Sequence, residues 1–250
     1  MEWDAKAYDK MLTFQVEINR AVEIPLVQNQ YFLKANSILD VGCGNGCFTA
    51  VLADMYPHKQ FVAIDNSEEL LSFATKNNSR QNITYIHVEY ASFKPQKLFD
   101  FVISRLVVHI IPDRANFFQW VYARLRPCGT FCVIDADDDN YCVYPKMPIF
   151  SSLEDQTNDK INHVGSRNTK EIVQSELCAS GFEKDRFFTF SPNSITVNKS
   201  IIMRYMLYVM KIEKGNQLPM EAYKELLEWY DNDDAFFQYG LYFGLFLKEG

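Results

Sequence analysis

The sequence lacks a long apolar run, an excess of basic residues and an apolar leader, and each absence excludes a class of protein. The longest apolar stretch, about 13 residues over 235–247, is interrupted by polar and glycine residues and is too short to cross a bilayer. Lys and Arg number 25 against 32 Asp and Glu, giving a net charge of −7, and no basic cluster could hold a nucleic-acid backbone. The first ten residues contain no apolar segment of the secretory type. We therefore expect a cytoplasmic protein with neither a membrane nor a nucleic acid as partner.

Cysteine pairs at metal-binding spacing are also missing. The chain has six cysteines but no C-x-x-C and no His-x-His pattern, so a zinc site has little support. In a cytoplasmic protein we expect all six to be reduced thiols, mostly small core residues. The acidic run 135–139 has two interpretations, a divalent-metal site or a solvated loop at the end of a strand. We favour the loop and predict no metal.

Aromatic residues are abundant instead, with 20 Phe and 14 Tyr among 250 residues. A chain of this length can bury a sizeable core, and its 48% hydrophobic and 23% charged content is ordinary for a globular protein. Tyrosine combines an apolar body with a polar tip and therefore also lines pockets. The composition favours a small-molecule partner and leaves open whether the protein is a monomer or a homodimer.

Short apolar runs alternate with helical patterns along most of the chain. Strands are predicted at 37–42, 60–65, 83–88, 99–104, 130–134, 187–190 and 236–247. Helices are predicted at 47–55, 68–76, 116–125, 169–180, 200–212 and 220–230, after an N-terminal helical segment of thirty residues that breaks at Pro25. This alternation predicts an α/β fold with a mostly parallel sheet covered by helices on both faces.

Three of the ten glycines fall within five residues, directly after the first predicted strand. Gly42, Gly44 and Gly46 would let a ligand approach bare backbone, beside the amide groups that begin the next helix. A dinucleotide-binding loop would carry its third glycine at position 47, which is Cys47, and the Gly-Lys-Ser/Thr of a P-loop is absent. The loop therefore predicts a different ligand.

The run from Ile38 to Gly46 closely resembles motif I of class I S-adenosylmethionine-dependent methyltransferases, with Asp40 two residues before the first glycine. Residues 125–130 resemble the turn that precedes the fifth strand in that family, with Cys128 replacing a glycine. The resemblance covers about residues 36–135. It implies a doubly wound, mostly parallel seven-stranded sheet with helices on both faces, a helical cap and a reversed last strand. It also implies S-adenosylmethionine as cofactor and S-adenosylhomocysteine as product.

The resemblance assigns a binding role to a set of residues along the ends of these strands. The implied cofactor-binding residues are Asp40, Gly42, Cys43, Gly44, Asp65, Asn66, Glu89, Tyr90 and Arg105. The glycine loop would pack against the aminocarboxypropyl arm, and Asp65 would accept hydrogen bonds from the two ribose hydroxyls. Glu89 would face the adenine amino group.

Three polar residues leave alternatives open. Arg105 would pair either with the cofactor carboxylate or, as a surface residue, with Asp100. His109 would act as a general base or would only line the pocket, since His titrates near neutral pH. Tyr8, on the N-terminal helix, would lie over the reacting groups or face the core. We take His109 and Tyr8 as the catalytic candidates.

The resemblance implies an enzyme of the S-adenosylmethionine-dependent methyltransferase class acting on a small-molecule acceptor, by O-, N- or C-methylation. We expect one domain of 1–250, with cap helices in 1–34, a cofactor-binding core in 35–135 and a substrate-side half in 136–250. That half would carry a helical insertion over about 195–232. A protein or RNA methyltransferase and a catalytically silent cofactor-binding module are the alternatives.

Overall fold

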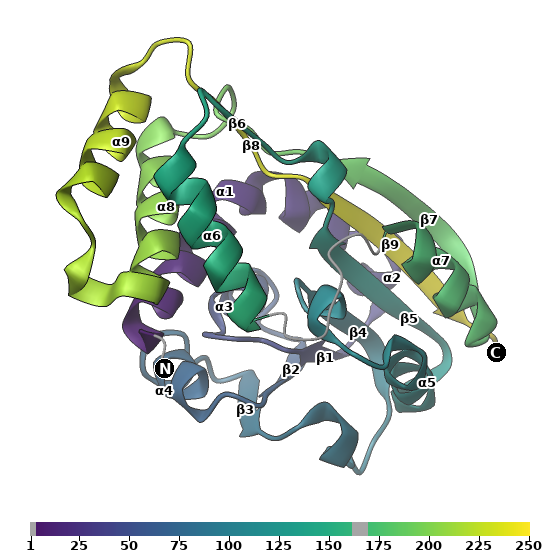
Figure 1. Cartoon of the computed structure of the whole chain (residues 1–250). Coiled ribbons are helices and arrows are strands. Elements are labelled where there is room, and N and C mark those ends of the chain that lie inside the picture. Colours follow the sequence, from purple (N-terminus) through teal and green to yellow (C-terminus); the bar gives the residue numbers. More distant parts are fainter. Residues whose placement is uncertain (1–3, 162–169) are drawn as a thin grey trace.

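The computed structural model describes residues 4–161 and 170–250, and these build a seven-stranded sheet in the order β3-β2-β1-β4-β5-β9-β7 (Figure 1). The strands are β1 (Ser37–Val41), β2 (Gln60–Asp65), β3 (Ile83–His87), β4 (Phe99–Arg105), β5 (Leu125–Ala136), β7 (Phe182–Phe190) and β9 (Leu241–Lys248). Strands β1 to β5 pair in parallel, whereas β9 runs antiparallel to both of its neighbours. The predicted sheet and its reversed last strand are confirmed.

Both faces of the sheet are buried. Helix α2 (Gln30–Lys34) precedes the first strand, and the helices α3 (Cys47–Met55), α4 (Glu68–Asn77), α5 (Arg114–Arg124) and α7 (Lys170–Ala179) follow later along the chain. Alternate residues of β1 enter different apolar clusters: Ile38 packs with residues of α2 and α3, and Leu39 with residues of α5 and α7. This period-two division between two apolar faces explains why the strands are short runs of continuous hydrophobic sequence.

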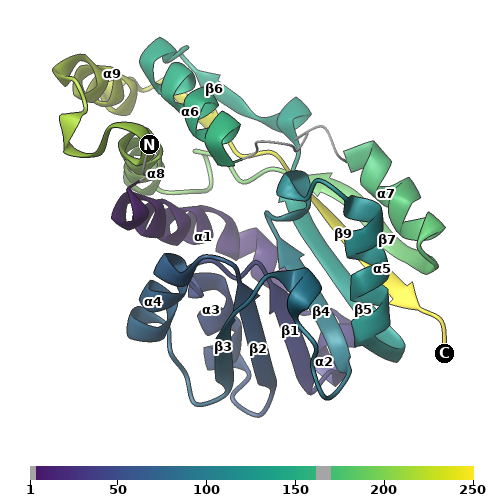
Figure 2. The ribbon, with the colours of Figure 1, turned by 60° about the horizontal axis from the view of Figure 1, so that its bottom comes forward.

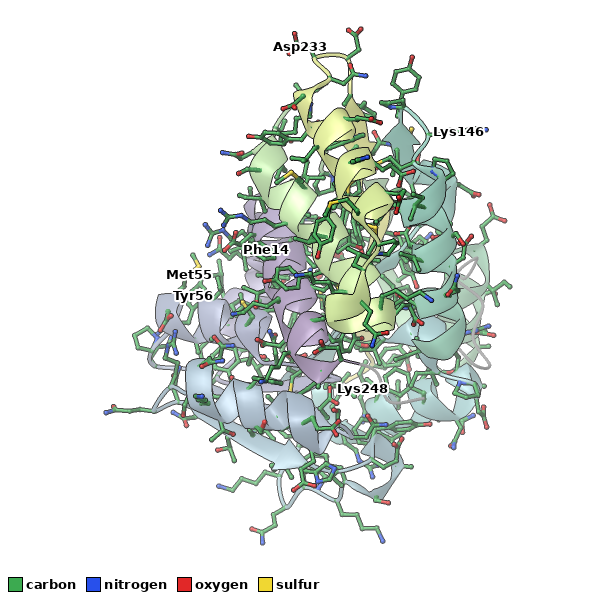
Figure 3. All side chains as sticks on the ribbon, turned by 60° about the vertical axis from the view of Figure 1, so that its left-hand side comes forward. Phe14, Met55, Tyr56, Lys146, Asp233 and Lys248 are labelled. Carbon is green, nitrogen blue, oxygen red and sulfur yellow. The ribbon has the colours of Figure 1, made fainter. Side chains whose placement is uncertain are left out.

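A helical cap lies across one end of the sheet (Figure 2). It consists of α1 (Ala5–Val27), α6 (Pro148–Ile161), α8 (Lys199–Lys214) and α9 (Met220–Asp231). Helices α1 and α8 pack along one another, and Phe14 of α1 is labelled in Figure 3. Its ring stacks on that of Tyr208 of α8, with centroids 5.7 Å apart. The cap therefore joins the N-terminal helix to the part of the chain that follows β7.

Several predicted boundaries are wrong. Pro25 does not break the first helix, because it lies in the last turn of α1, which continues to Val27. The predicted strand 236–247 divides at Gly240: β8 (Phe236–Gln238) leaves the main sheet and pairs with β6 (Cys142–Tyr144). Strand β7 begins five residues before its predicted start, and α6 was not predicted. The predicted first residue of the helix 169–180 lies outside the described residues.

Two further expectations concern burial. The apolar side chains of α1, among them Met11 and Ile18, belong to the same core cluster as those of α3, so α1 is part of the core as well as of the cap. Of the six cysteines only Cys132 is buried, and three are exposed, which contradicts their prediction as mostly core residues. No helix among the described residues is long and apolar enough to cross a membrane.

Candidate functional site

A cavity of about 490 Å³ opens where the strand ends meet the cap. It lies at the carboxyl ends of β1, β2 and β4, where the strand order reverses between β1 and β4, the usual ligand position in open α/β sheets. Ten of the eleven predicted site residues line it: Tyr8, Asp40, Gly42, Cys43, Gly44, Asp65, Asn66, Glu89, Tyr90 and Arg105. The exception is His109.

The carboxylate of Asp65, at the end of β2, is hydrogen-bonded to the backbone of the glycine loop. The amide of Gly44 donates to Oδ2 of Asp65 at 2.7 Å, and the amide of Ser67 donates to Oδ1 at 2.9 Å. Gly42 and Gly44 have φ values of 74° and 56°, which side chains other than glycine rarely adopt. Burial raises the pKa of the Asp65 carboxyl above its ordinary value. The Asp65 carboxylate therefore lies next to the glycine loop. Each of its oxygens has a further lone pair that can accept a hydrogen bond from a hydroxyl group of a ligand.

Asp40 lies beneath the loop and is only 3% exposed. Its Oδ2 accepts a hydrogen bond of 2.5 Å from the hydroxyl of Thr49, which belongs to α3. Burial raises the pKa of Asp40 to about 6. A cationic group placed in the cavity would favour the ionised carboxylate.

The far end of the cavity is more open. Glu89 accepts a hydrogen bond from the side-chain amide of Asn66 at 3.2 Å. Tyr90 places its ring edge-on against Phe117 and Trp120, with centroids 5.0 and 5.5 Å away. This end therefore presents a carboxylate and a partly apolar surface side by side, which suits a planar heterocycle with an exocyclic amino group.

Arg105 is buried and paired, but not with the predicted surface partner. Its Nε donates to Glu23 at 2.8 Å and its Nη1 to Gln15 at 3.4 Å, whereas Asp100 pairs with Arg126 at the opposite end of β4. The surface interpretation of Arg105 is therefore wrong. Its buried Nη2 has no partner among the described residues, and Arg105 lines the cavity. A buried guanidinium with an unsatisfied donor fits an anionic group of a ligand.

The wall opposite the glycine loop comes from the cap. Tyr8, Leu12 and Gln15 share one face of α1, and Thr157 of α6 and Ile212 of α8 complete this wall. Burial, with Asp65 and Tyr239 nearby, raises the pKa of the Tyr8 hydroxyl, so this group stays protonated. The cavity is thus enclosed by groups that come from distant parts of the chain.

A hydrogen-bonded link fastens α1 to the glycine loop. The side-chain amide of Asn45 donates to the backbone oxygen of Asp9 at 3.0 Å, to its carboxylate at 2.9 Å and to the hydroxyl of Thr13 at 3.2 Å. Asn45 is 3% exposed and Asp9 5%. Because these groups are buried, the link holds the cap helix in a defined position over the loop.

His109 is placed differently from the other candidates. Its Nδ1 lies 2.5 Å from Oδ1 of Asp135, and it is absent from the described residues that line the cavity. The acidic run that begins there is only partly solvated: Asp135 is fully buried, and Asp137 is 2% exposed and paired with Lys170, whereas Asp139 is exposed. Among the described residues, no three potential ligands gather into a metal-binding group. A role of His109 as a general base stays a prediction.

Several residues that line the cavity were not predicted from the sequence, and they are of two kinds. Leu12 and Gln15 could have been found, because they lie four and seven residues after Tyr8 on a predicted helix. No sequence pattern indicates that Thr157 and Ile212 line the cavity, since neither belongs to a motif and each comes from a different cap helix. The role of Glu23 could not be predicted from the sequence either, because only the tertiary structure brings it to Arg105.

Comparison with known proteins agrees with this site. Residues 33–203 match the family model described as a methyltransferase domain. The chain belongs to the class I S-adenosylmethionine-dependent methyltransferases. Its cofactor is therefore S-adenosylmethionine. The orphaned Nη2 of Arg105, the buried carboxyl of Asp40 and the backbone of the glycine loop fit the carboxylate, the ammonium and the carbon chain of the arm that ends at its sulfonium.

Curated relatives of this methyltransferase share only part of its sequence. Malonyl-(acyl-carrier protein) O-methyltransferase 2 of Ilyobacter polytropus is 20% identical over 73% of this chain and 69% of the relative. Trans-aconitate 2-methyltransferase of Azoarcus sp. is 27% identical over 52% of this chain, and the match spans about half of the relative, 49%. The similarity is therefore too distant to transfer a substrate.

Solved structures show the same fold over nearly the whole chain. Phosphoethanolamine N-methyltransferase 2 of Haemonchus contortus, in complex with S-adenosyl-L-methionine, superposes with a TM-score of 0.58 at 17% identity, covering 93% of this chain and 52% of that one. The N-methyltransferase NodS of Bradyrhizobium japonicum gives 0.56 at 15% identity, covering 93% and 97%. At these identities the likeness concerns the fold alone.

Proposed function

We propose that this methyltransferase transfers the methyl group of S-adenosylmethionine to a small-molecule acceptor bound beneath its cap. The observation that supports this is the single cavity bounded on one side by the glycine loop and on the other by α1, α6 and α8. Its volume of about 490 Å³ lies in the range of small-molecule sites and leaves limited room beside a cofactor. We further propose a cytoplasmic location.

The cofactor would occupy the side of the cavity formed by the strand ends. Gly42, Cys43 and Gly44 would lie against its aminocarboxypropyl arm, with Asp40 near the ammonium and Arg105 near the carboxylate. The ribose hydroxyls would donate to Asp65. At the open end, the adenine would lie between Asn66, Glu89 and Tyr90. In this arrangement the carboxylate and the ammonium of the ligand each lie near a side chain of opposite charge.

The acceptor would occupy the side formed by the cap. The cofactor supplies an electrophilic methyl group on a sulfonium, so the protein has to align the acceptor and exclude water. Tyr8 and Leu12 on α1, with Thr157 and Ile212 opposite, would do this. We propose that the helices of 1–34 and the helical insertion of about 195–232, joined by α6, form this cap on a core of 35–135, within one domain.

The test separates binding from turnover. Calorimetry should show binding of S-adenosylhomocysteine and no comparable binding of NAD. Formation of S-adenosylhomocysteine from S-adenosylmethionine should then depend on an added acceptor, chosen from panels of small carboxylic acids, phenols and amines. Tight NAD binding would overturn the cofactor assignment. Turnover only with proteins or RNA, or no turnover with any acceptor despite cofactor binding, would overturn the proposed acceptor class.

A further inference from the structure

The buried carboxylate of Asp135 gathers donors from one loop. Asp135 is fully buried at the end of β5. Its Oδ2 accepts from the backbone amides of Val107, Val108 and His109 at 3.1, 2.7 and 3.4 Å. Its Oδ1 accepts from the amide of Ala136 at 2.7 Å and lies 2.5 Å from Nδ1 of His109. A buried carboxylate with this many donors is fully satisfied, and so are the donors.

The loop that Asp135 holds forms the cavity floor. It follows β4, and Leu106, Val107, Ile110 and Ile111 line the cavity together with Arg105. Leu106 adopts a φ of 57°, a left-handed conformation that costs free energy for a side chain with a Cβ. The chain turns sharply there, and the next three amides point at a single carboxylate. Interactions outside Leu106 must therefore maintain this loop conformation.

One residue of this loop also touches the glycine loop. A Cβ atom built on Gly42 would overlap Cγ2 of Val107. These two residues are therefore in close contact beyond the carboxyl ends of the neighbouring strands β1 and β4. The amide of Val107 is one of the donors to Asp135. A shift of Val107 would move atoms directly against Gly42, where the cofactor arm would lie.

We propose that Asp135 is a positioning residue of the methyltransferase, which holds Val107 against Gly42 through the backbone amides of the loop after β4 and through the His109 ring. This inference rests on the proposed function, because the cofactor pocket is what the loop shapes. In this arrangement His109 acts through Asp135 on the loop, a role that differs from that of the predicted general base.

Electrostatics support the same arrangement. Burial alone would raise the pKa of Asp135, but the His109 ring and the backbone amides outweigh burial and hold that pKa below its ordinary value. The carboxylate is therefore ionised when the loop is in place. An amide side chain at this position would have the same shape but would turn a donor toward donors.

The opposite end of β4 offers a matched control. Asp100 accepts from the amides of Asn36 and Ser37 at 2.9 Å each and also pairs with Arg126, and its pKa is likewise held below its ordinary value. It does not line the cofactor cavity. Asp100→Asn therefore removes a carboxylate of the same chemistry without touching the loop after β4.

The experiment compares S-adenosylhomocysteine affinity by calorimetry in Asp135→Asn, Asp100→Asn and the wild type, at a temperature where urea unfolding shows each to be folded. Asp135→Asn should weaken binding about tenfold or more, and Asp100→Asn by less than about twofold. Equal affinities in the two variants would overturn the proposal. A wild type that does not bind the ligand would instead refute the proposed function.

His109 provides a second test in case Asp135→Asn does not fold. Without any acceptor present, His109→Ala should weaken S-adenosylhomocysteine binding about threefold to tenfold, because the loop loses one of its contacts to Asp135. His109→Asn places an amide nitrogen near the position of Nδ1 and should restore most of the affinity. A general base would affect turnover and leave this affinity unchanged, so an unchanged affinity in His109→Ala would overturn the proposal.

Discussion

The two walls of the cavity are built in different ways. The wall formed by the strand ends uses backbone amides and short polar side chains, and its residues come from a continuous part of the chain between Asp40 and Ile111. The cap wall is lined by residues of α1, α6 and α8, three helices that lie far apart in sequence. The first wall is a property of parallel strands and their loops, and the second depends on how helices pack.

This difference separates the general part of the site from the specific part. Backbone amides can be presented by many sequences as long as glycine permits the turn, so different sequences can build the same kind of cofactor wall. Side chains on packed helices change with every substitution, so the cap wall can differ between enzymes with the same cofactor. The following predictions test whether the two walls behave as different units, in order of decreasing effect.

The largest effect should come from the core contact of α1. Ile18→Ala removes a side chain that is 1% exposed, and it should lower the free energy of unfolding by about 2–5 kcal/mol. Urea unfolding followed by circular dichroism measures this. Leu33→Ala, at a side chain 52% exposed, is the control and should cost under about 1 kcal/mol. A small effect at Ile18 would mean that α1 is a detachable lid.

The cofactor wall should be most sensitive at Asp65. Asp65→Ala removes the proposed acceptor of the ribose hydroxyls and the acceptor of the Gly44 amide, so it should weaken S-adenosylhomocysteine binding by about 1.5–3 kcal/mol. Calorimetry measures this loss. Asp54→Ala, at a carboxylate that pairs with Arg80 outside the cavity, should leave binding unchanged. An unaffected Asp65→Ala variant would contradict the proposed orientation of the cofactor.

Asn45 connects the two walls, and its loss should uncouple them. Asn45→Ala removes the bonds to Asp9 and Thr13, so amide hydrogen exchange over residues 5–16 should accelerate, with a cost to ligand binding of about 1–2 kcal/mol. Asn82→Ala is the control, because this side-chain amide also donates to three oxygens, none of which belongs to α1. Equal acceleration in both variants would show only a general loss of stability.

Asp40 should make ligand binding depend on pH. Its pKa of about 6 in the folded chain exceeds its ordinary value of 3.8, so the folded state binds the proton more tightly than the unfolded state. The contribution of Asp40 to the free energy of unfolding therefore falls as the pH rises between these two values. An ammonium group in the cavity would favour the ionised form. Affinity for S-adenosylhomocysteine should therefore rise with pH up to about 6, by at most about tenfold per pH unit. Asp40→Asn should flatten this profile in calorimetry, and a profile that stays steep would place the dependence elsewhere.

The smallest effect is expected from the hydroxyl of Tyr8. Because its pKa is raised, the hydroxyl remains protonated, and Tyr8→Phe keeps the ring that lines the cavity. Turnover, measured as S-adenosylhomocysteine formed, should fall by less than about tenfold with cofactor affinity unchanged. Tyr31→Phe, whose hydroxyl bonds Asp185 outside the cavity, is the control. A loss of more than about a hundredfold would give the hydroxyl a direct part in the reaction.

The cofactor side could be predicted because its signals are local. Helix 47–55 and strand 60–65 have the predicted bounds, and Cys128 adopts a φ of 61° where the family has glycine, as expected for a variant of that turn. Pro25 misled the prediction: proline costs a helix the hydrogen bond that its missing N–H would donate, yet α1 continues through Pro25 for two more residues, to Val27.

The sequence by itself determined the strand–loop–helix order and the glycine loop, because hydrophobic periodicity and left-handed turns are properties of neighbouring residues. Only the tertiary structure decided that Glu23 meets Arg105, that Asp135 holds the loop after β4 and that Asn45 binds α1. The partners in each of these contacts are separated by 82, 27 and 36 positions. No local pattern records such pairings, because each depends on which buried donor and acceptor the packed chain brings within hydrogen-bonding distance.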